Sequence, residues 1–424
     1  MYFATRFPYR PSLRCIHMAY LSVTFMASYI FIVQLVQLYI QVVFFTVYYL
    51  QCSFYARTKR MKQTMKYTQI IEDLKHQILS GKIKAGDKLP SENQLSESYG
   101  ISRQTVRKAL QVLEQEDYIY AVHGKGTFCS EKMRHLHKSK NIAVITTYLS
   151  DYIFPRVIQG IDKVLTENGY SIMLKNTKNS RTLESKVLQE LLEKDIDGLI
   201  IEPSKSHIFC KHTKLYKLLD DYQIPYVFIQ GSYTQMEGKP HILMDDRKGG
   251  YLITKYLIDT GHKDIVGIFK SDDTQGQERH RGYADALKEA CIPYDPDKVI
   301  WFYTEDRSIH PYERTRQLAK KRDKLHFDSI VCYNDQVAID VIRALKDENL
   351  SVPEDVSVTG YDNSYLAETC MIPLTTIEHP QEKLGEMAAE LLLKCLSANP
   401  LSEEEKQVLI EPKIVVRESV TEIS

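Results

Sequence analysis

The sequence predicts an α/β protein in which a small helical head with a β-hairpin precedes a larger two-lobed body. Helical periodicity with capping patterns fills residues 65–130, and apolar strand-like runs then alternate with helical segments to about residue 418. At 424 residues and 43% hydrophobic content, the chain is long enough for two or three packed domains. This composition excludes a disordered chain and a disulfide-stapled mini-protein.

The first 64 residues differ in composition from the rest. They hold seven basic residues and no acidic one, since the first carboxylate is Glu72, and without them 48 basic residues face 55 acidic ones. The uncharged run Tyr29–Leu50 has 22 residues and could span a bilayer. Two interpretations stay open: a membrane anchor, or an upstream stretch outside the working reading frame, with synthesis starting at Met61 or Met65. The absence of acidic residues and the abrupt change of composition favour the second.

Three helices are predicted in the head. Apolar residues at helical spacing form the first, which ends at Gly81. Ser91, with Gln94 three residues later, is a capping box that opens a second helix ending at Gly100. Because Ser102 caps the third helix, only a tight turn separates the two, which is the helix-turn-helix pattern. Residues 119–122 and 127–129 are strand-like and flank a tip that contains two glycines. Residues 119–129 therefore predict a hairpin, the wing.

The third helix and the hairpin tip carry side chains suited to DNA. The first turn of a recognition helix meets base edges, where Arg can bond guanine and Gln can bond adenine. Hydroxyls at the helix start suit phosphates, and tip glycines allow close backbone approach. A solvated charged helix face is the alternative, and the combined caps, turn and hairpin disfavour it. The candidate contacts are Ser102, Arg103, Gln104, Thr105, Arg107, Lys108, His123, Gly124, Lys125 and Gly126.

The motifs Leu89–Glu92, Gly100–Arg103, Thr105–Leu110 and Gly124–Phe128 resemble the winged-helix head of GntR-family transcription regulators. The resemblance covers residues 65–130 and implies binding to double-stranded operator DNA. Asn93 stands where many members have a basic residue, so we do not expect a phosphate contact at this position. The implied contacts are Ser91, Ser102, Arg103, Thr105, Arg107, His123, Gly124 and Gly126.

Residues 131–140 are polar and basic and predict a linker, after which the body begins at residue 141. Strand-like runs alternate with helical periodicity, which predicts parallel sheets with helices on both faces. About 280 residues exceed one small doubly wound domain, so two lobes are expected. The runs are Ile142–Ile145, Ile172–Leu174, Gly198–Ile201, Tyr226–Ile229, Ile265–Phe269, Ser329–Cys332 and Val356–Val358.

Polar residues shortly after these strands predict a ligand site, because ligands of such sheets lie beyond the carboxyl ends of the strands. Carboxylates, amides and one Arg suit a neutral polyol, and the aromatic rings of Tyr152, Phe154 or Trp301 could cover its apolar face. Capping is the alternative role for each Asp or Asn. For Asp335 we predict that role, at the start of a helix over Gln336–Leu345. The polar candidates are Asp151, Tyr152, Gln230, Asp245, Asp246, Arg279, Asn334 and Asp362.

The motifs Arg279–Tyr283, Tyr333–Ala338, Val352–Val358, Gly360–Asp362 and Pro373–Ile377 resemble the effector domain of LacI/GalR repressors, which is related to periplasmic sugar-binding proteins. The resemblance covers residues 141–418 and implies a two-lobed type I periplasmic-binding-protein-like fold. The implied sugar contacts are Arg279, Asn334 and Asp362, with Asp151, Tyr152, Phe154 and Gln230 as further placements.

A GntR-type head on a LacI/GalR-type body resembles the arabinose-operon repressors of Gram-positive bacteria. The resemblance implies a homodimeric, cytoplasmic, nucleoid-associated repressor that L-arabinose releases from its operator.

The eight Cys are scattered without a Cys-x-x-Cys spacing, and nucleophile and metalloprotease motifs are absent from the sequence. We therefore expect neither an enzyme nor a cofactor or metal. Two rival hypotheses are a membrane-anchored sugar-sensing regulator and a sugar-modifying enzyme that uses the cleft carboxylates.

Overall fold

The computed structural model describes residues 67–78, 81–130, 139–149, 152–322, 325–397 and 401–423, which form two compact units. The predictions for residues 1–64, for most of the linker and for Asp151 concern residues outside this described part. Within it, every helix is too short or too polar to cross a bilayer.

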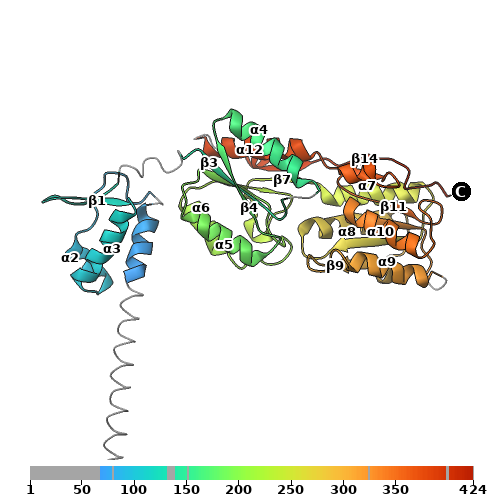
Figure 1. Cartoon of the computed structure of the whole chain (residues 1–424), viewed down its shortest axis with the longest axis horizontal. Coiled ribbons are helices and arrows are strands. Elements are labelled where there is room, and N and C mark those ends of the chain that lie inside the picture. Colours follow the sequence, from blue (N-terminus) through green and yellow to red (C-terminus); the bar gives the residue numbers. More distant parts are fainter. Residues whose placement is uncertain are drawn as a thin grey trace, which may run out of the picture. The chain divides into compact units, whose positions relative to one another are not determined.

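The head has the predicted helix-turn-helix and wing (Figure 1). A helix over residues 67–78 is followed by α2 (Glu92–Tyr99) and α3 (Arg103–Gln115), and then by the hairpin of β1 (Ile119–Val122) and β2 (Gly126–Cys129). The capping box at Ser91 and the Ser102 cap are both present, and Gly100 between the helices is left-handed, with φ 59°. The core of the head consists of buried apolar side chains from these helices, namely Ile70, Leu74, Ile78, Leu95, Val106, Ala109, Leu110 and Leu113.

The first lobe of the body is built on a parallel sheet with the strand order β13-β7-β6-β5-β3-β4. Its strands are β3 (Asn141–Thr146), β4 (Ser171–Asn176), β5 (Gly198–Ile201), β6 (Tyr226–Ile229), β7 (His241–Met244) and β13 (Gln407–Ile410). Its helices are α4 (Phe154–Glu167), α5 (Arg181–Leu192), α6 (Thr213–Asp221), α12 (Gln381–Leu396) and the short α13 (Glu403–Lys406). Alternate strand residues face opposite sides, so α5 and α6 pack on one face and α4 and α12 on the other.

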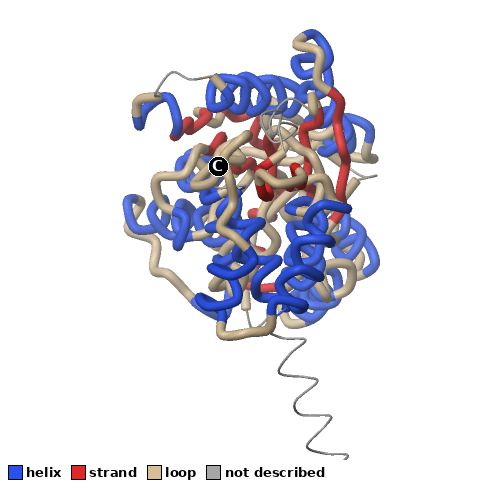
Figure 2. The backbone as a smooth tube through the Cα atoms, turned by 90° about the vertical axis from the view of Figure 1, so that its left-hand side faces the viewer, coloured by secondary structure: helices blue, strands red, loops and turns tan. Residues whose placement is uncertain are grey.

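The second lobe has a parallel sheet with the strand order β11-β10-β8-β9 and an antiparallel pair, β12 with β14. Its strands are β8 (Ile265–Lys270), β9 (Val299–Phe302), β10 (Ser329–Cys332), β11 (Ser357–Thr359), β12 (Thr376–Glu378) and β14 (Lys413–Val415). Its helices are α7 (Asp246–Asp259), α8 (Thr274–Glu289), α9 (His310–Lys320), α10 (Asp335–Asp347) and α11 (Tyr365–Thr369). Helices flank the strands on both faces here as well. In Figure 2 the strands, in red, run among the helices, in blue.

The chain passes between the lobes three times: from β7 to α7, from β12 to α12, and from β13 to β14. All seven predicted strand runs form strands. The strands β7, β9, β12, β13 and β14 are not among the predicted runs. The last three are short and depend on partners distant in the sequence, such as β7 for β13.

Helices α7 and α8 cross at van der Waals contact because glycines lie at the crossing. A Cβ atom at Gly250 would overlap the carbonyl oxygen of Arg279, and one at Gly282 would overlap that of Arg247. This close approach brings Asp246 at the start of α7 next to Arg279 in the second turn of α8.

We predict that Gly282→Ala destabilises the protein. The better helix propensity of Ala contributes roughly 1 kcal/mol, but forcing a methyl group against backbone costs roughly 1–3 kcal/mol and separates the two helices. Urea unfolding should therefore give a lower free energy of unfolding. Lys288→Ala, on the exposed side of the same helix, is the control and should change it by less than about 0.5 kcal/mol.

Candidate DNA-binding surface and effector cavity

The exposed face of α3 carries the predicted DNA-reading side chains. Arg103, Gln104, Arg107 and Lys108 are all exposed, whereas the opposite face is buried in the head. This orientation follows from the helical spacing, because Val106, Ala109, Leu110 and Leu113 must pack inward. The predicted DNA-reading side chains therefore share one exposed face of α3.

Thr105 differs from the expectation of a direct DNA contact. It is only 7% exposed, its backbone N–H donates to Ser102 Oγ at 3.2 Å, and the two hydroxyl oxygens lie 2.9 Å apart. Thr105 therefore stabilises the start of α3, and the exposed Ser102 is the hydroxyl available to a phosphate.

Arg107 makes a bidentate ion pair that the sequence analysis did not anticipate. Its Nε and Nη2 donate to Glu92 Oε1 and Oε2 at 2.9 and 2.8 Å, which lowers the pKa of Glu92. The pair ties α3 to the first residue of α2, while the Arg107 side chain stays 63% exposed. It thus fixes the guanidinium without removing it from the surface.

The wing tip has the geometry that its glycines predict. Gly124 and Gly126 have φ of 75° and 118°, which other residues adopt only with strain, and His123 and Lys125 are exposed beside them. Below the tip, the rings of Tyr120 and Phe128 stack at 5.8 Å and pair the two strands.

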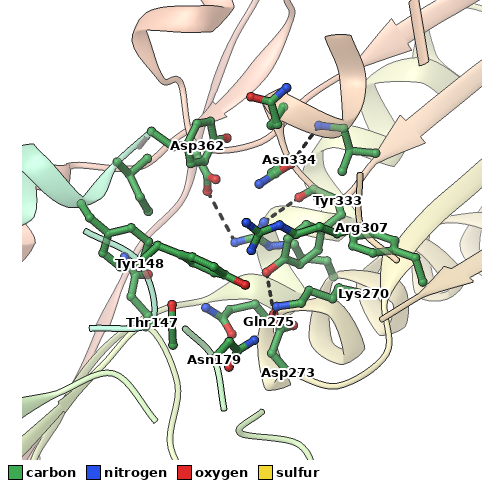
Figure 3. Close-up of a pocket in the computed structure, with 18 of the residues that line it drawn as sticks. Thr147, Tyr148, Asn179, Lys270, Asp273, Gln275, Arg307, Tyr333, Asn334 and Asp362 are labelled. Atoms are coloured by element: carbon green, nitrogen blue, oxygen red, sulfur yellow. Dashed lines mark hydrogen bonds and ion pairs between the residues drawn. The ribbon is translucent and has the colours of Figure 1, made fainter. Parts of the chain in front are cut away.

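The body contains a cavity of about 510 Å³ lined by residues of both lobes (Figure 3). The effector contacts that the resemblance implies all line it within the described part of the chain, namely Tyr152, Phe154, Gln230, Arg279, Asn334 and Asp362. The polar candidates Asp245 and Asp246 do not, because Asp245 caps α7 and Asp246 pairs with Arg279. In Figure 3, Thr147, Tyr148 and Asn179 lie across the hollow from Tyr333 and Asn334. The segments that follow the carboxyl ends of the strands therefore line this cavity.

Arg279 is the most constrained side chain of the cavity. It is 4% exposed; Nε donates to Asp246 Oδ1 at 2.8 Å, Nη1 donates to the Tyr333 carbonyl at 2.6 Å, and Nη2 lies 3.6 Å from Asp362 Oδ1. Its guanidinium carbon lies 3.5 Å from the ring centre of Tyr361. Burial opposes the charge, but the two carboxylates hold the pKa of Arg279 well above its ordinary value. Arg279 lies in the second turn of α8.

The cap of α10 is Asn334, and not Asp335 as the sequence predicted. Asn334 caps α10, since its side chain accepts from the Val337 N–H at 3.1 Å. Asp335 is fully buried within the helix and accepts hydrogen bonds from Ser364 and Thr376, and burial raises its pKa to about 7. The predicted cap at Asp335 is wrong by one residue. Asn334 caps with its oxygen and still lines the cavity.

Four cavity residues have left-handed backbone conformations. Tyr152, Asn179, Gln230 and Asp362 have φ of 76°, 52°, 65° and 99°, which are uncommon for residues other than Gly. Each follows a strand end and turns its side chain into the cavity. Strain of this kind persists where the surrounding structure fixes it and is concentrated at functional sites.

Several cavity residues were missed, although the strand-end rule applies to them too. Lys270, at the end of β8, forms an ion pair with Asp273 at 2.9 Å. Burial alone would lower the pKa of Lys270, but the negative charges of Asp273 and Asp272 outweigh it and raise this pKa. Glu202 after β5 accepts from the Thr147 N–H at 2.7 Å and from its hydroxyl at 2.6 Å. The other missed residues include Tyr148, Asn179, Gln275, Arg307 and Tyr333.

Trp301 does not line the cavity. It lies on β9, where its ring packs against His280 and Phe269 at 4.8 and 5.9 Å between ring centres. The aromatic residues at the cavity are instead Tyr148, Tyr152, Phe154, Phe302 and Tyr333.

The two lobes touch directly around the cavity. The Tyr152 hydroxyl donates to the Tyr361 carbonyl at 3.0 Å and accepts from the Asp335 N–H at 3.1 Å. Asn179 Nδ2 donates to Thr304 Oγ1 at 2.7 Å. Bonds of this kind join the lobes on either side of the hollow, so a ligand inside contacts both.

The lining suits an uncharged, hydroxyl-rich ligand. The deeply buried cations Lys270 and Arg279 each have a carboxylate partner at hydrogen-bond distance. The exposed Arg307 also lines the cavity, with its guanidinium carbon 4.0 Å from the ring centre of Tyr148. The other lining residues supply directional donors and acceptors with aromatic faces, as recognition of a polyol requires. Among the described residues, Asp, Glu, His and Cys side chains form no group that could hold a metal ion.

Comparison with known proteins identifies the domain types of the head and the body. Bacterial regulatory proteins of the gntR family match residues 66–129, and a periplasmic binding protein-like domain matches residues 254–420. An arabinose metabolism transcriptional repressor of Halalkalibacterium halodurans is 40% identical over 367 residues, covering 84% of this chain and 97% of that protein. The chain belongs to the family of arabinose metabolism transcriptional repressors. Family membership confirms the predicted DNA-binding repressor and implies a regulator rather than an enzyme.

Solved structures agree with the fold. The transcription regulator CcpA of Lactococcus lactis is 28% identical with a TM-score of 0.58, covering 66% of this chain and 99% of that one. A LacI family transcriptional regulator from Enterococcus faecium with bound ribose has a TM-score of 0.56 at 23% identity, covering 67% of this chain and all of that one. The predicted LacI/GalR-type fold of the body is therefore confirmed.

Glu202 predicts a pH-dependent stability. Burial raises its pKa to about 7, so from about pH 4.3 to 7 the folded protein holds a proton that the unfolded chain releases. This contribution to stability is therefore lost as pH rises. Glu202→Gln cannot ionise, and its free energy of unfolding relative to the unmodified protein should rise by roughly 2–3 kcal/mol between pH 5 and 8.

Urea unfolding at the two pH values measures this difference. The exposed Glu305 has a lowered pKa and is ionised throughout, so Glu305→Gln should give no such trend. An equal trend in both variants would contradict the assignment to Glu202.

Proposed function

We propose that this chain represses arabinose-utilisation genes as a homodimer and leaves its operator when L-arabinose fills the cavity. The observation that carries the proposal is the presence, in one chain, of a DNA-reading head and a cavity whose polar groups suit an uncharged sugar. The name of the relative that is 40% identical supports arabinose as the sugar. We assign residues 65–130 to the head, 131–140 to the linker and 141–418 to the effector domain.

The proposed mechanism is a shift between two arrangements of the lobes. A sugar bonded to Asp362 in one lobe and Gln230 in the other favours the closed arrangement. In a dimer, the two heads read the two halves of a palindrome. A change in the arrangement of the two subunits therefore prevents both heads from binding their half-sites at the same time. Sugar and DNA must then oppose each other reciprocally, by roughly 5- to 150-fold in affinity.

We place this activity in the cytoplasm, on chromosomal DNA, without cofactor or catalysis. Incubation with labelled pentoses tests the enzyme alternative, because any turnover would contradict pure sensing. Fractionation of the full-length product tests the membrane-anchor alternative, which requires residues 16–55 to hold the chain in the membrane fraction.

Arg103→Ala and Lys125→Ala should affect DNA binding differently. Loss of a base-reading Arg costs roughly 1–3 kcal/mol on the preferred sequence and little elsewhere. Loss of a phosphate-contacting Lys weakens binding on all sequences and reduces the salt slope by about 1. DNA selected from a random pool by the protein itself is the probe, with a shuffled duplex beside it. Equal losses on both duplexes for Arg103→Ala would refute its base-reading role.

Arg279→Ala should yield a repressor that binds DNA but ignores L-arabinose. The variant leaves Asp246 unpaired, so the double variant Asp246→Asn, Arg279→Met, which removes both buried charges, separates loss of sensing from loss of folding. Arg281→Ala, on the exposed side of the same helix, is the matched control and should still respond. Titration of operator DNA with and without saturating sugar measures the response, and a normal response in the double variant would exclude this role.

A further inference from the structure

His379 lies behind the cavity, on the crossover between β12 and α12. It is 4% exposed, and its Nε2 is 3.0 Å from Oε1 of Gln230, which is also 4% exposed and lines the cavity from the other side. Gln230 has a left-handed backbone and belongs to the first lobe, following β6. The imidazole therefore reaches from the crossover to a ligand-facing amide.

The position of the proton on His379 follows from its surroundings. Burial lowers its pKa to about 4, so the ring is neutral and carries one proton at neutral pH. The Gln230 oxygen can only accept, so Nε2 must donate. Nδ1 is then unprotonated and has no hydrogen-bond partner in the described structure. An unpaired buried acceptor of this kind costs less free energy than an unpaired buried N–H donor.

The consequence falls on the other end of the Gln230 amide. Its oxygen is occupied by the imidazole, and its Nε2 is buried without a partner in the described structure. A buried, unpaired NH₂ group is costly unless a ligand accepts from it. Gln230 lines the cavity, so a ligand oxygen that reached this NH₂ group from the cavity would remove that cost.

The same crossover also supports the opposite wall. Gln381 Nε2 donates to the Asp362 carbonyl at 3.2 Å, and the Asp362 N–H donates to the Ile377 carbonyl at 2.9 Å. Asp362 faces the cavity as an acceptor, next to Arg279. Residues 377–381 therefore contact both Gln230, the donor of the first lobe, and Asp362, the acceptor of the second.

We propose that His379 is a positioning residue for effector recognition: it locks the Gln230 amide so that its NH₂ group faces the cavity as a hydrogen-bond donor to a sugar oxygen. This inference rests on the proposed function, in which the cavity takes a sugar. Without the imidazole the amide can turn over and present its oxygen, which cannot bond a sugar ring oxygen and which a sugar hydroxyl can meet only by turning its hydrogen toward the amide.

Calorimetric titration of the full chain with L-arabinose tests the role of His379 by a double-mutant cycle with Gln230. His379→Phe removes the donor and should weaken binding roughly tenfold, and Gln230→Ala should weaken it at least as much. In the Gln230→Ala background, His379→Phe should cause no further loss, because its effect passes through the amide. His379→Gln keeps an N–H donor at similar reach and should stay within about threefold of the unmodified chain.

An equal loss from His379→Phe in both backgrounds would overturn the proposal, because the ring would then act by packing alone. An unchanged affinity would do so too. His326→Phe replaces a histidine whose side chain is 67% exposed and should leave binding unaltered. Thermal unfolding of each variant verifies that it is folded.

Nitrogen NMR of the histidine-labelled chain tests the tautomer without any sugar. We expect a protonated Nε2 and a bare Nδ1 at His379, and the reverse would refute the proposal even in a chain that binds L-arabinose. A chain with the expected tautomer that does not bind L-arabinose would instead contradict the proposed function, so the two failures are distinguishable.

Discussion

The body is organised around one buried cation, the guanidinium of Arg279. Removing this charge from water costs several kcal/mol, and the structure offsets that cost with Asp246, the Tyr333 carbonyl and the Tyr361 ring. These partners come from α7 and from the ends of β10 and β11, so the charge fixes how these elements meet. The glycines at the α7–α8 crossing are needed for the same reason, since a wider spacing would pull Asp246 away from the guanidinium.

A cation that is already paired limits what the cavity can bind. Arg279 and Lys270 both have carboxylate partners, so an anionic ligand would compete with Asp246 or Asp273 for charges that are not free. An uncharged ligand can bind without breaking either pair, by using the outward-facing donors and acceptors. Discrimination among such ligands then depends on the direction of each hydrogen bond, which is why the orientation of the Gln230 amide matters.

Local sequence patterns made much of the fold and of the cavity lining predictable. The caps at Ser91 and Ser102 depend on residues three apart, and the strand-end rule brought together Gln230, Arg279 and Asp362, which lie far apart in the sequence. The failures have physical reasons. Asp and Asn cap equally well, so pattern alone could not distinguish Asn334 from Asp335. Trp301 lies on an unpredicted strand, and the partners of Arg107 and His379 belong to other elements, which no periodicity reveals.

Charge constrains how the head can bind DNA. Residues 67–129 carry eight basic and eight acidic side chains, so net attraction to a phosphate backbone is absent there. The asymmetry lies along α3 instead, with Arg103, Arg107 and Lys108 in its first half and Glu114 and Glu116 at its end, and the helix dipole reinforces it. A head that neutralises few phosphates binds weakly alone, because non-specific affinity follows the number of such contacts. In the proposed dimer, tight binding therefore requires both heads at once, and a small change between subunits is enough to release it.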